Sequence, residues 1–252
     1  MQETYDNSGI QIIQGEAPLT GIFLSLDISM ETILRAHESG CNLICTHHPL
    51  LFKPLSRIDV SNYRERLVFE LIQRKISLYS IHTTMDRVYC LKTAALLGLE
   101  NASVLFPDFA GSETGFGSMG TLADPESFGD FLKTVATAFG SPYLTYTGNE
   151  KRLIKTAAVV NGSGASQIYS LFDRGIDCVI TGDVKYHEAH DACKAGLCLV
   201  DAGHFWTERF FMDHLYDELF KFLTEAGKKT AMYVDCEEKN PLKLFVSGDR
   251  DE

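Results

Sequence analysis

The feature that most constrains this fold is the alternation of short apolar runs with amphipathic stretches along the whole chain. Apolar runs bounded by turn residues are typical of buried strands, whereas apolar residues at helical spacing are typical of helices packed on a sheet. The runs that we interpret as strands are residues 21–27, 41–46, 76–82, 154–160, 177–181 and 197–201. Strands that alternate with helices predict an α/β fold with mostly parallel or mixed sheets.

Capping residues mark several predicted helices. Ser29 is an N-cap candidate for a helix that ends before Gly40. Asp124-Pro125 places a proline in the favoured first turn of a helix that reaches Phe139. Further helices are predicted over residues 63–75, 165–173, 184–194 and 206–226, and two β-like runs, 229–235 and 242–246, follow in the tail.

The best candidate for a domain boundary is the stretch 106–127, which is rich in Gly, Ser and Pro. It predicts a junction near residue 105. We expect the C-terminal β-like runs to return to the first domain. The predicted organisation is therefore two interlocked α/β domains, the first formed by residues 1–105 plus about 200–252 and the second by residues 106–199.

Charge and hydropathy argue against several classes of protein. The chain has 23 basic and 34 acidic residues, a formal net charge of -11, and no basic stripe of the kind that nucleic acid or anionic lipid requires. No run of about 18 apolar residues predicts a membrane span. The N-terminus lacks the basic and apolar regions of a secretory signal, so the seven cysteines are expected to be free thiols in a reducing cytoplasm.

Polar, metal-capable side chains follow nearly every predicted strand at the point where it ends. Ligands bind outside the carboxyl ends of the strands in open α/β sheets, so this arrangement predicts a site there. The glycine-rich segment among them, 161–164, can hold a phosphate on its N–H groups or simply form a tight turn. The segments are His47-His48-Pro49, His82 to Asp86, Asn161 to Gly164, Thr181-Gly182-Asp183, and Asp201 to His204, with Glu208 one turn later.

Two pairs of residues carry the metal hypothesis. Successive strand side chains point to opposite faces, so His47 and His48 serve one cleft only if the chain turns, as Pro49 favours; otherwise one histidine is a ligand and the other packs. His204 and Glu208 are four residues apart, which places them on one helical face, although a solvated surface pair is the more common case.

Asp86 adds a carboxylate from a third segment. Histidines combined with two carboxylates suit a dinuclear site, at which a bound water becomes a nucleophile near neutral pH. The ligand types suit Zn, Fe, Mn or Ni equally well. We therefore expect two divalent metal ions per subunit, of one of these elements.

Weaker motifs also have ordinary structural interpretations. Cys41 and Cys45 resemble a zinc pair, but on a strand they lie roughly 13 Å apart, so we interpret them as buried structural thiols. HEAH at 187–190 is one residue shorter than the zincin motif. Its His187 and His190 can chelate a metal, but a helix-surface position is the more common case. Asp183 is either a helix N-cap or a site carboxylate.

Four segments in order resemble a known family: THHPLLF (46–52), IHTTMD (81–86), TGDVKYHEAHDA (181–192) and DAGHFWTE (201–208). They closely resemble the YbgI-like, NGG1-interacting-factor-3-like dinuclear-metal family, whose members are often labelled GTP cyclohydrolase 1 type 2 homologs. The opening DNSGIQI (6–12) also resembles the start of that family. The resemblance covers the chain from Tyr5 to about Phe245.

The resemblance implies a two-domain α/β subunit with a metal cleft between the domains, and assembly into a toroidal homohexamer. It also implies the short form of the family, because residues 106–152 are too few for an inserted domain. Two positions depart from the family pattern, since Thr84 replaces an Asn and Trp206 replaces a small residue. The metal ligands that it implies are His47, His48, Asp86, His204 and Glu208.

The leading hypothesis is a cytoplasmic metal-dependent hydrolase with a small-molecule substrate. The family label implies a nucleotide, whose guanine ring would be opened by a metal-activated hydroxide, with Asp183, His187 or His190 as a proton shuttle or orienting group. Lys185 and Arg209 are the positive groups nearest in sequence. A dinuclear phosphoesterase is the second hypothesis. A non-enzymatic hexameric metal-binding scaffold or metallochaperone is the third.

Overall fold

The computed structural model describes residues 5–245, and the chain divides into two compact units. Unit 1 comprises Met1–Lys92, Val104–Gly117 and Glu208–Glu238, and unit 2 comprises Thr93–Ser103, Ser118–Thr207 and Lys239–Glu252. Between residues 5 and 245, no helix has both the length and the apolar character needed to cross a membrane. The predicted boundaries near residues 105 and 200 concern independently folding domains and stay a prediction.

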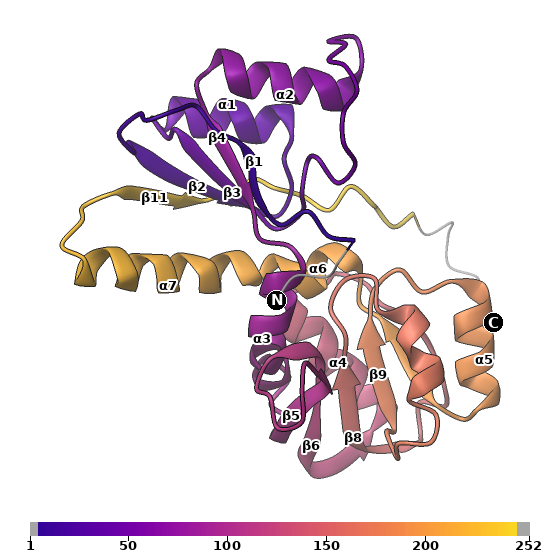
Figure 1. Ribbon diagram of the computed structural model, residues 1–252. Coiled ribbons are helices and arrows are strands. Elements are labelled where there is room, and N and C mark those ends of the chain that lie inside the picture. The colour runs from indigo at the N-terminus through magenta and orange to yellow at the C-terminus, as the bar shows by residue number, and fades with distance from the viewer. Residues whose placement is uncertain (1–4, 246–252) are drawn as a thin grey trace. The chain divides into compact units, whose positions relative to one another are not determined.

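Unit 1 is built on a five-stranded mixed sheet with the order β1-β4-β3-β2-β11 (Figure 1). Strands β4, β3, β2 and β11 run parallel to their neighbours, and the edge strand β1 runs antiparallel to β4. Strand β11, from the first of the two C-terminal β-like runs, pairs with β2 and so belongs to the first sheet. The bounds are β1 Gly9–Ile12, β2 Gly21–Ser25, β3 Leu43–Thr46, β4 Ser77–Ser80 and β11 Ala231–Val234.

Helices cover both faces of this sheet (Figure 1). Helices α1 (Met30–Glu38) and α2 (Tyr63–Gln73) pack on one face, where Phe23 and Ile44 join their apolar side chains in a core. Helix α7 (Phe211–Glu225) packs on the other face around Phe211. With both faces buried, the central strands read as continuous apolar runs, as the sequence predicts.

A second, six-stranded mixed sheet has the order β5-β6-β8-β9-β10-β7 and belongs largely to unit 2. Strands β8, β9 and β10 are parallel, whereas β6 runs antiparallel to β8 and β7 runs antiparallel to β10. The strands are β5 Glu100–Pro107, β6 Gly115–Ser127, β7 Thr145–Thr147, β8 Leu153–Val159, β9 Cys178–Thr181 and β10 Cys198–Asp201. The remaining helices of the chain are α3 Thr83–Leu96 and α6 His204–Arg209, whose residues are divided between the two units, and, in unit 2, α4 Phe128–Phe139, the 3-10 helix η1 Ala165–Ser170 and α5 Tyr186–Lys194. The predicted α/β class with mixed sheets is confirmed.

The predicted helix start at Asp124-Pro125 is wrong, because these residues belong to the long strand β6. Helix α4 begins at Phe128, and its N-cap is Ser127, whose hydroxyl accepts a hydrogen bond from a first-turn amide. Pro125 lies where the pairing of β6 with β8 shifts register. A proline is tolerated at such a bulge because no regular ladder hydrogen bond needs its missing N–H.

Three other predicted elements differ from the structure. The helix expected over 206–226 is two helices, α6 and α7, separated at Phe210, where the sequence has no Gly or Pro to signal a break. The stretch 165–173 forms only the 3-10 helix η1. The tail run Leu242–Phe245 forms no strand and is exposed, and Val246 lies outside the described residues.

All seven cysteines are free, which confirms the prediction of free thiols. Cys41 and Cys45 are buried, as expected for structural thiols, and burial raises the pKa of Cys45 to about 12.

A phenylalanine pair tests the packing of unit 2. Phe131 in α4 is fully buried at 0% exposure, whereas Phe222 in α7 is 65% exposed. We expect Phe131→Ala to lower the free energy of unfolding by about 3–5 kcal/mol, because it removes buried contacts and leaves a cavity. Phe222→Ala should change it by less than about 0.5 kcal/mol. Urea unfolding measures both, and equal effects would contradict the assigned core.

Candidate functional site

The carboxyl ends of β3 and β4, the first turn of α3 and the last turn of α6 bring metal-capable side chains together in unit 1. His47 and His48 follow β3, Asp86 lies in the first turn of α3, and Glu208 lies in α6. One ligand atom from each of His47, Asp86 and Glu208 lies within 4.8 Å of the others. His47, His48 and His82, which follows β4, form a second group within the same limit. Three segments distant in sequence, around residues 47–48, 82–86 and 208, therefore supply one cluster.

His47 is the most constrained member of the cluster. Its side chain is fully buried at 0% exposure, and its ring packs edge-on against Phe211. Its Nδ1 lies 3.1 Å from the Ile81 carbonyl oxygen, which can only accept, so Nδ1 carries the proton. Its Nε2 has no hydrogen-bond partner among the described residues. This nitrogen lies 3.5 Å from Glu208 Oε1 and 3.8 Å from Asp86 Oδ1.

These separations suit a metal ion. Two ligands of one divalent ion lie about 3–4 Å apart, given bonds of about 2.0–2.2 Å to imidazole nitrogen and carboxylate oxygen. A buried, lone Nε2 with two carboxylate oxygens at such distances has the donor types and the spacing of three such ligands. The residues present therefore fit a metal ion, and these side chains can hold one.

His48 lies between two carboxylates. Its Nδ1 is 2.9 Å from Asp27 Oδ1 and its Nε2 is 3.1 Å from Glu208 Oε2. Burial alone would lower the pKa of His48, but the hydrogen bonds to Asp27 and Glu208 raise it to about 10. Without a metal this ring is therefore an imidazolium held by two anions. A divalent cation at Nε2 would replace the proton there.

His82 and Asp6 are functional candidates whose roles sequence reasoning did not assign. Asp6 Oδ1 accepts a hydrogen bond from His82 Nδ1 at 2.7 Å, and its other oxygen accepts the hydroxyls of Ser8 and Thr83, each at 2.6 Å. Burial lowers the pKa of His82, and the bond to Asp6 opposes that shift. The signal was present in the DNSGIQI opening and in His82 itself, but nothing local connects segments 76 residues apart.

Asp183 and His204 form a comparable pair within unit 2. Asp183 Oδ2 lies 2.7 Å from His204 Nδ1, and Asp183 has a left-handed backbone with φ +56°. A Cβ at the adjacent Gly182 would lie 2.6 Å from the His204 backbone nitrogen, so only glycine fits this close approach. His204 stands one turn before Glu208 on α6. The Asp183 carboxylate is therefore a hydrogen-bond partner of the His204 ring within unit 2.

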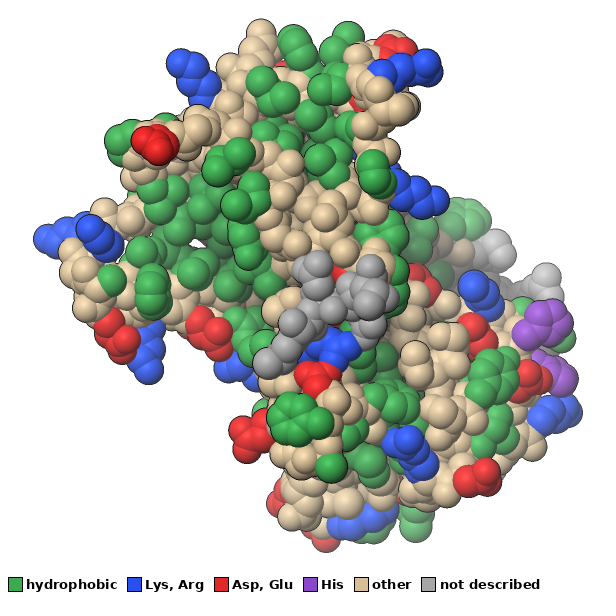
Figure 2. All heavy atoms as spheres, viewed as in Figure 1, with side chains coloured by type: hydrophobic (Ala, Val, Ile, Leu, Met, Phe, Trp, Pro, Cys, Tyr) green, Lys and Arg blue, Asp and Glu red, His purple; other side chains and the backbone are tan. Residues whose placement is uncertain are grey.

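The remaining candidates from the sequence lie elsewhere in unit 2. His187 and His190 are exposed on α5 beside Tyr186, and Figure 2 shows histidine side chains at the surface over that helix. Within the described part of unit 2 they join no group of three metal-capable side chains. In the segment 161–164, the N–H groups of Gly162 and Gly164 donate to threonine hydroxyls. That segment is a tight turn, not an open phosphate cradle.

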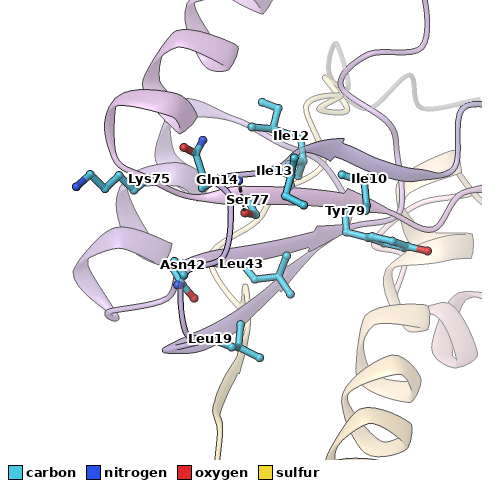
Figure 3. A pocket seen from close by; sticks show the side chains of 13 residues that line it. Ile10, Ile12, Ile13, Gln14, Leu19, Asn42, Leu43, Lys75, Ser77 and Tyr79 are labelled. Atoms are coloured by element: carbon cyan, nitrogen blue, oxygen red, sulfur yellow. Dashed lines mark hydrogen bonds between the residues drawn. The ribbon is translucent and has the colours of Figure 1, made fainter.

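An apolar groove of about 280 Å³ lies at the other end of β3 and β4 in unit 1 (Figure 3). Ile10, Ile13 and Tyr79 line it and are partly exposed, and Figure 2 shows hydrophobic side chains gathered over this sheet. Its lining contains no His, Cys, Asp or Glu. The chemistry of unit 1 is therefore concentrated at the carboxyl ends of the strands and not in this groove.

The arrangement of these residues can now be compared with known proteins. The family model for Duf34/NIF3 (NGG1p interacting factor 3) matches residues 1–241. The chain belongs to the Duf34/NIF3 family. A Clostridium acetobutylicum relative named GTP cyclohydrolase 1 type 2 homolog is 33% identical, over 97% of this chain and 92% of that protein. A Helicobacter pylori relative named GTP cyclohydrolase 1 type 2 is 36% identical, over 84% of this chain and 82% of that protein.

Solved structures show the same fold. The Staphylococcus aureus hypothetical protein SA1388 superposes with a TM-score of 0.90 at 25% identity, covering 96% of this chain and 93% of that one. A Bacillus cereus protein related to NIF3 has the same fold, with a TM-score of 0.89 at 21% identity over 97% of this chain and 94% of that one. The resemblance to the NGG1-interacting-factor-3-like family, read from four sequence motifs, is confirmed.

Substitution of Asp6 tests the network that orders His82. Burial opposes ionisation of Asp6, but hydrogen bonds from Ser8, Thr83 and His82 outweigh it and hold its pKa at about 2. A folded-state pKa below the usual value adds stability that is present above about pH 4 and is lost as the pH falls through 2. We expect Asp6→Asn to lower the free energy of unfolding by about 1–2 kcal/mol at pH 7.

The test compares urea unfolding of Asp6→Asn and the unchanged chain at pH 7 and near pH 2.5. The difference between the two proteins should narrow at the acidic pH. A difference that is the same at both values would show that the Asp6 charge contributes nothing.

Proposed function

We propose that this Duf34/NIF3 protein is a metal-dependent hydrolase with a dinuclear centre. The observation that carries the proposal is the convergence of the buried His47 Nε2 with the carboxylates of Asp86 and Glu208. A buried nitrogen without a hydrogen-bond donor and two nearby anions form an arrangement that a divalent cation satisfies. The proposed ligands are His47, His48, Asp86, His204 and Glu208.

Glu208 is the residue that supports two ions at one site, because its two oxygens face different histidines. Its Oε1 faces His47 Nε2 at 3.5 Å, and its Oε2 faces His48 Nε2 at 3.1 Å. Each carboxylate oxygen thus serves a different imidazole, which supports a bridging role. His47 and Asp86 would hold one ion with Glu208. His48 would hold the other with Glu208, and His204, one helical turn before Glu208 in the chain, stays a predicted ligand.

The chain's own residues would hold and orient these ligands. A pair of divalent ions supplies, when bound, an activated water and a clamp on the oxygens of the reacting group. The Ile81 carbonyl, Asp27 and Asp183 would hold the Nδ1 atoms of His47, His48 and His204, so that Nε2 is the atom of each ring that would face an ion. We assign Asp183 to this orienting role. Proton transfer by His187 or His190 stays a prediction.

A nucleotide is the substrate class that the relatives support. Proteins with 33% and 36% identity to this chain carry the names GTP cyclohydrolase 1 type 2 homolog and GTP cyclohydrolase 1 type 2. We therefore propose hydrolytic opening of the guanine ring of GTP. With a net charge of -11, the chain would bind triphosphate through its metals and a few local basic side chains. Zn, Fe, Mn and Ni all suit the ligand set.

We also propose a homohexamer in the cytoplasm. The support for self-association is the apolar groove of unit 1 with its exposed side chains Ile10, Ile13 and Leu19, since large apolar patches are typical of interaction surfaces. The number of subunits rests on the family resemblance alone and stays a prediction.

Glu208→Gln tests the ligand set. The substitution keeps the volume of the side chain but replaces an anion by a neutral amide, so we expect bound metal to fall from about two ions to one or none per chain. Elemental analysis of protein purified without added metal measures this. Glu225→Gln, at the exposed end of α7, is the matched control. Unchanged metal content in Glu208→Gln would contradict the ligand set.

Turnover tests the reaction. We expect protein loaded with Zn, Mn, Fe or Ni to convert GTP to a ring-opened product, followed by ultraviolet absorbance and mass spectrometry, and Glu208→Gln to be at least 100-fold slower. Hydrolysis of a generic phosphodiester but not of GTP would instead favour a phosphoesterase. Full metal occupancy without turnover of either would contradict the hydrolase and favour a metal-binding scaffold.

A further inference from the structure

The C-terminal turn after β11 is hydrogen-bonded to the loop that follows β2. In this turn, both carboxylate oxygens of Glu238 accept hydrogen bonds from adjacent backbone N–H groups of the loop. Its Oε2 accepts from the Leu26 amide at 2.8 Å, and its Oε1 accepts from the Asp27 amide at 2.7 Å. Two charge-assisted hydrogen bonds accepted by one carboxylate fix both the position and the orientation of the loop. The two segments are more than 200 residues apart in the chain.

The turn is itself anchored inside unit 1. The Asp235 side chain is only 1% exposed, and its Oδ2 lies 2.6 Å from Arg35 Nη2 of helix α1. The Asp235 amide donates to the Leu24 carbonyl at 2.8 Å, which continues the pairing of β11 with β2. Glu238 therefore reaches the loop from a fixed base.

The loop after β2 is in turn hydrogen-bonded to His47 and His48. The Ser25 and Leu26 carbonyls accept the amides of His47 and His48 at 3.2 and 2.9 Å. Asp27 Oδ1 then accepts from His48 Nδ1 at 2.9 Å, which leaves His48 Nε2 directed at Glu208. The backbone and the ring of His48 are thus both set by residues 26 and 27, whose amides Glu238 holds.

We propose that Asp27 and Glu238 are positioning residues of the metal site, acting in series on His48. This inference rests on the proposed function, because it assigns a role toward the ion that His48 would hold. Asp27 fixes the His48 ring with Nε2 available, and Glu238 fixes Asp27. Partners of this kind raise metal affinity by about 10–100-fold without touching the ion. The acidic C-terminal turn is therefore part of the site.

The experiment measures zinc affinity of the full-length chain by competition with a chromophoric chelator. We expect Glu238→Gln and Asp27→Ala each to weaken the ion held by His48 by about 10–100-fold and to leave the other ion unchanged. Glu237→Gln is the matched control, because Glu237 is the exposed neighbour of Glu238. Asp27→Asn should stay within a few-fold of the unchanged chain, since its amide oxygen still accepts from Nδ1.

A double-mutant cycle separates positioning from general stabilisation. If Glu238 acts through Asp27, then Glu238→Gln adds almost nothing to the loss of zinc affinity in the Asp27→Ala background. Effects of two independent residues would instead multiply. Thermal unfolding of the metal-free variants gives the second measurement, and the unfolding midpoints should not order the variants as their zinc affinities do.

Each outcome decides between distinct statements. The proposal that Glu238 acts through Asp27 on His48 is overturned if Glu238→Gln has the same zinc affinity as the unchanged chain, or if the two effects multiply in the cycle. Either result leaves the proposed metal site intact. Absence of zinc binding by the unchanged chain overturns the proposed function itself. If Glu238→Gln does not fold, the zinc affinities of Asp27→Ala and Asp27→Asn are compared instead. Equal affinities of these two variants overturn the proposal. Substitutions at Asp27 suit this comparison because its side chain is 57% exposed, so that the variants should still fold.

Discussion

The site in unit 1 depends on one buried imidazole. His47 is fully buried, and its Nε2 has no hydrogen-bond partner among the described residues although two carboxylate oxygens lie within 4 Å. A lone buried nitrogen costs about 1–3 kcal/mol, and bringing anions close together in a poorly solvated place costs more. A cation between these groups reverses the sign of the interaction. The end of β3, the first turn of α3 and the last turn of α6 supply these groups.

The same logic recurs at every histidine of the candidate site. His47, His48, His82 and His204 each direct Nδ1 at an oxygen atom that can only accept, and the acceptors come from four separate segments. A carbonyl or carboxylate at Nδ1 selects the tautomer whose Nε2 lone pair is available.

Sequence could locate the ligand candidates but not the residues that orient them. His47, His48, Asp86 and Glu208 were found because strand ends and helical spacing are local patterns. Asp6, Asp27 and Glu238 act on segments 76, 21 and 211 residues away, and no periodicity links such positions. The same limit explains the errors in the fold. The strand that contains Pro125 is stabilised by pairing with β8, and the break at Phe210 has no Gly or Pro to announce it.

The scattered origin of these residues ties metal binding to the folding of unit 1. Ligand candidates from β3, α3 and α6 meet only when the sheet and its helices have formed, so the unfolded chain offers no comparable site. A ligand that binds only the folded state stabilises it, by an amount that grows with its concentration over its dissociation constant. Positioning residues enter the same balance. In the proposed site, Asp27 and Glu238 would hold His48 before an ion binds, which would place the ordering cost in the folding of the chain rather than in the binding of the metal.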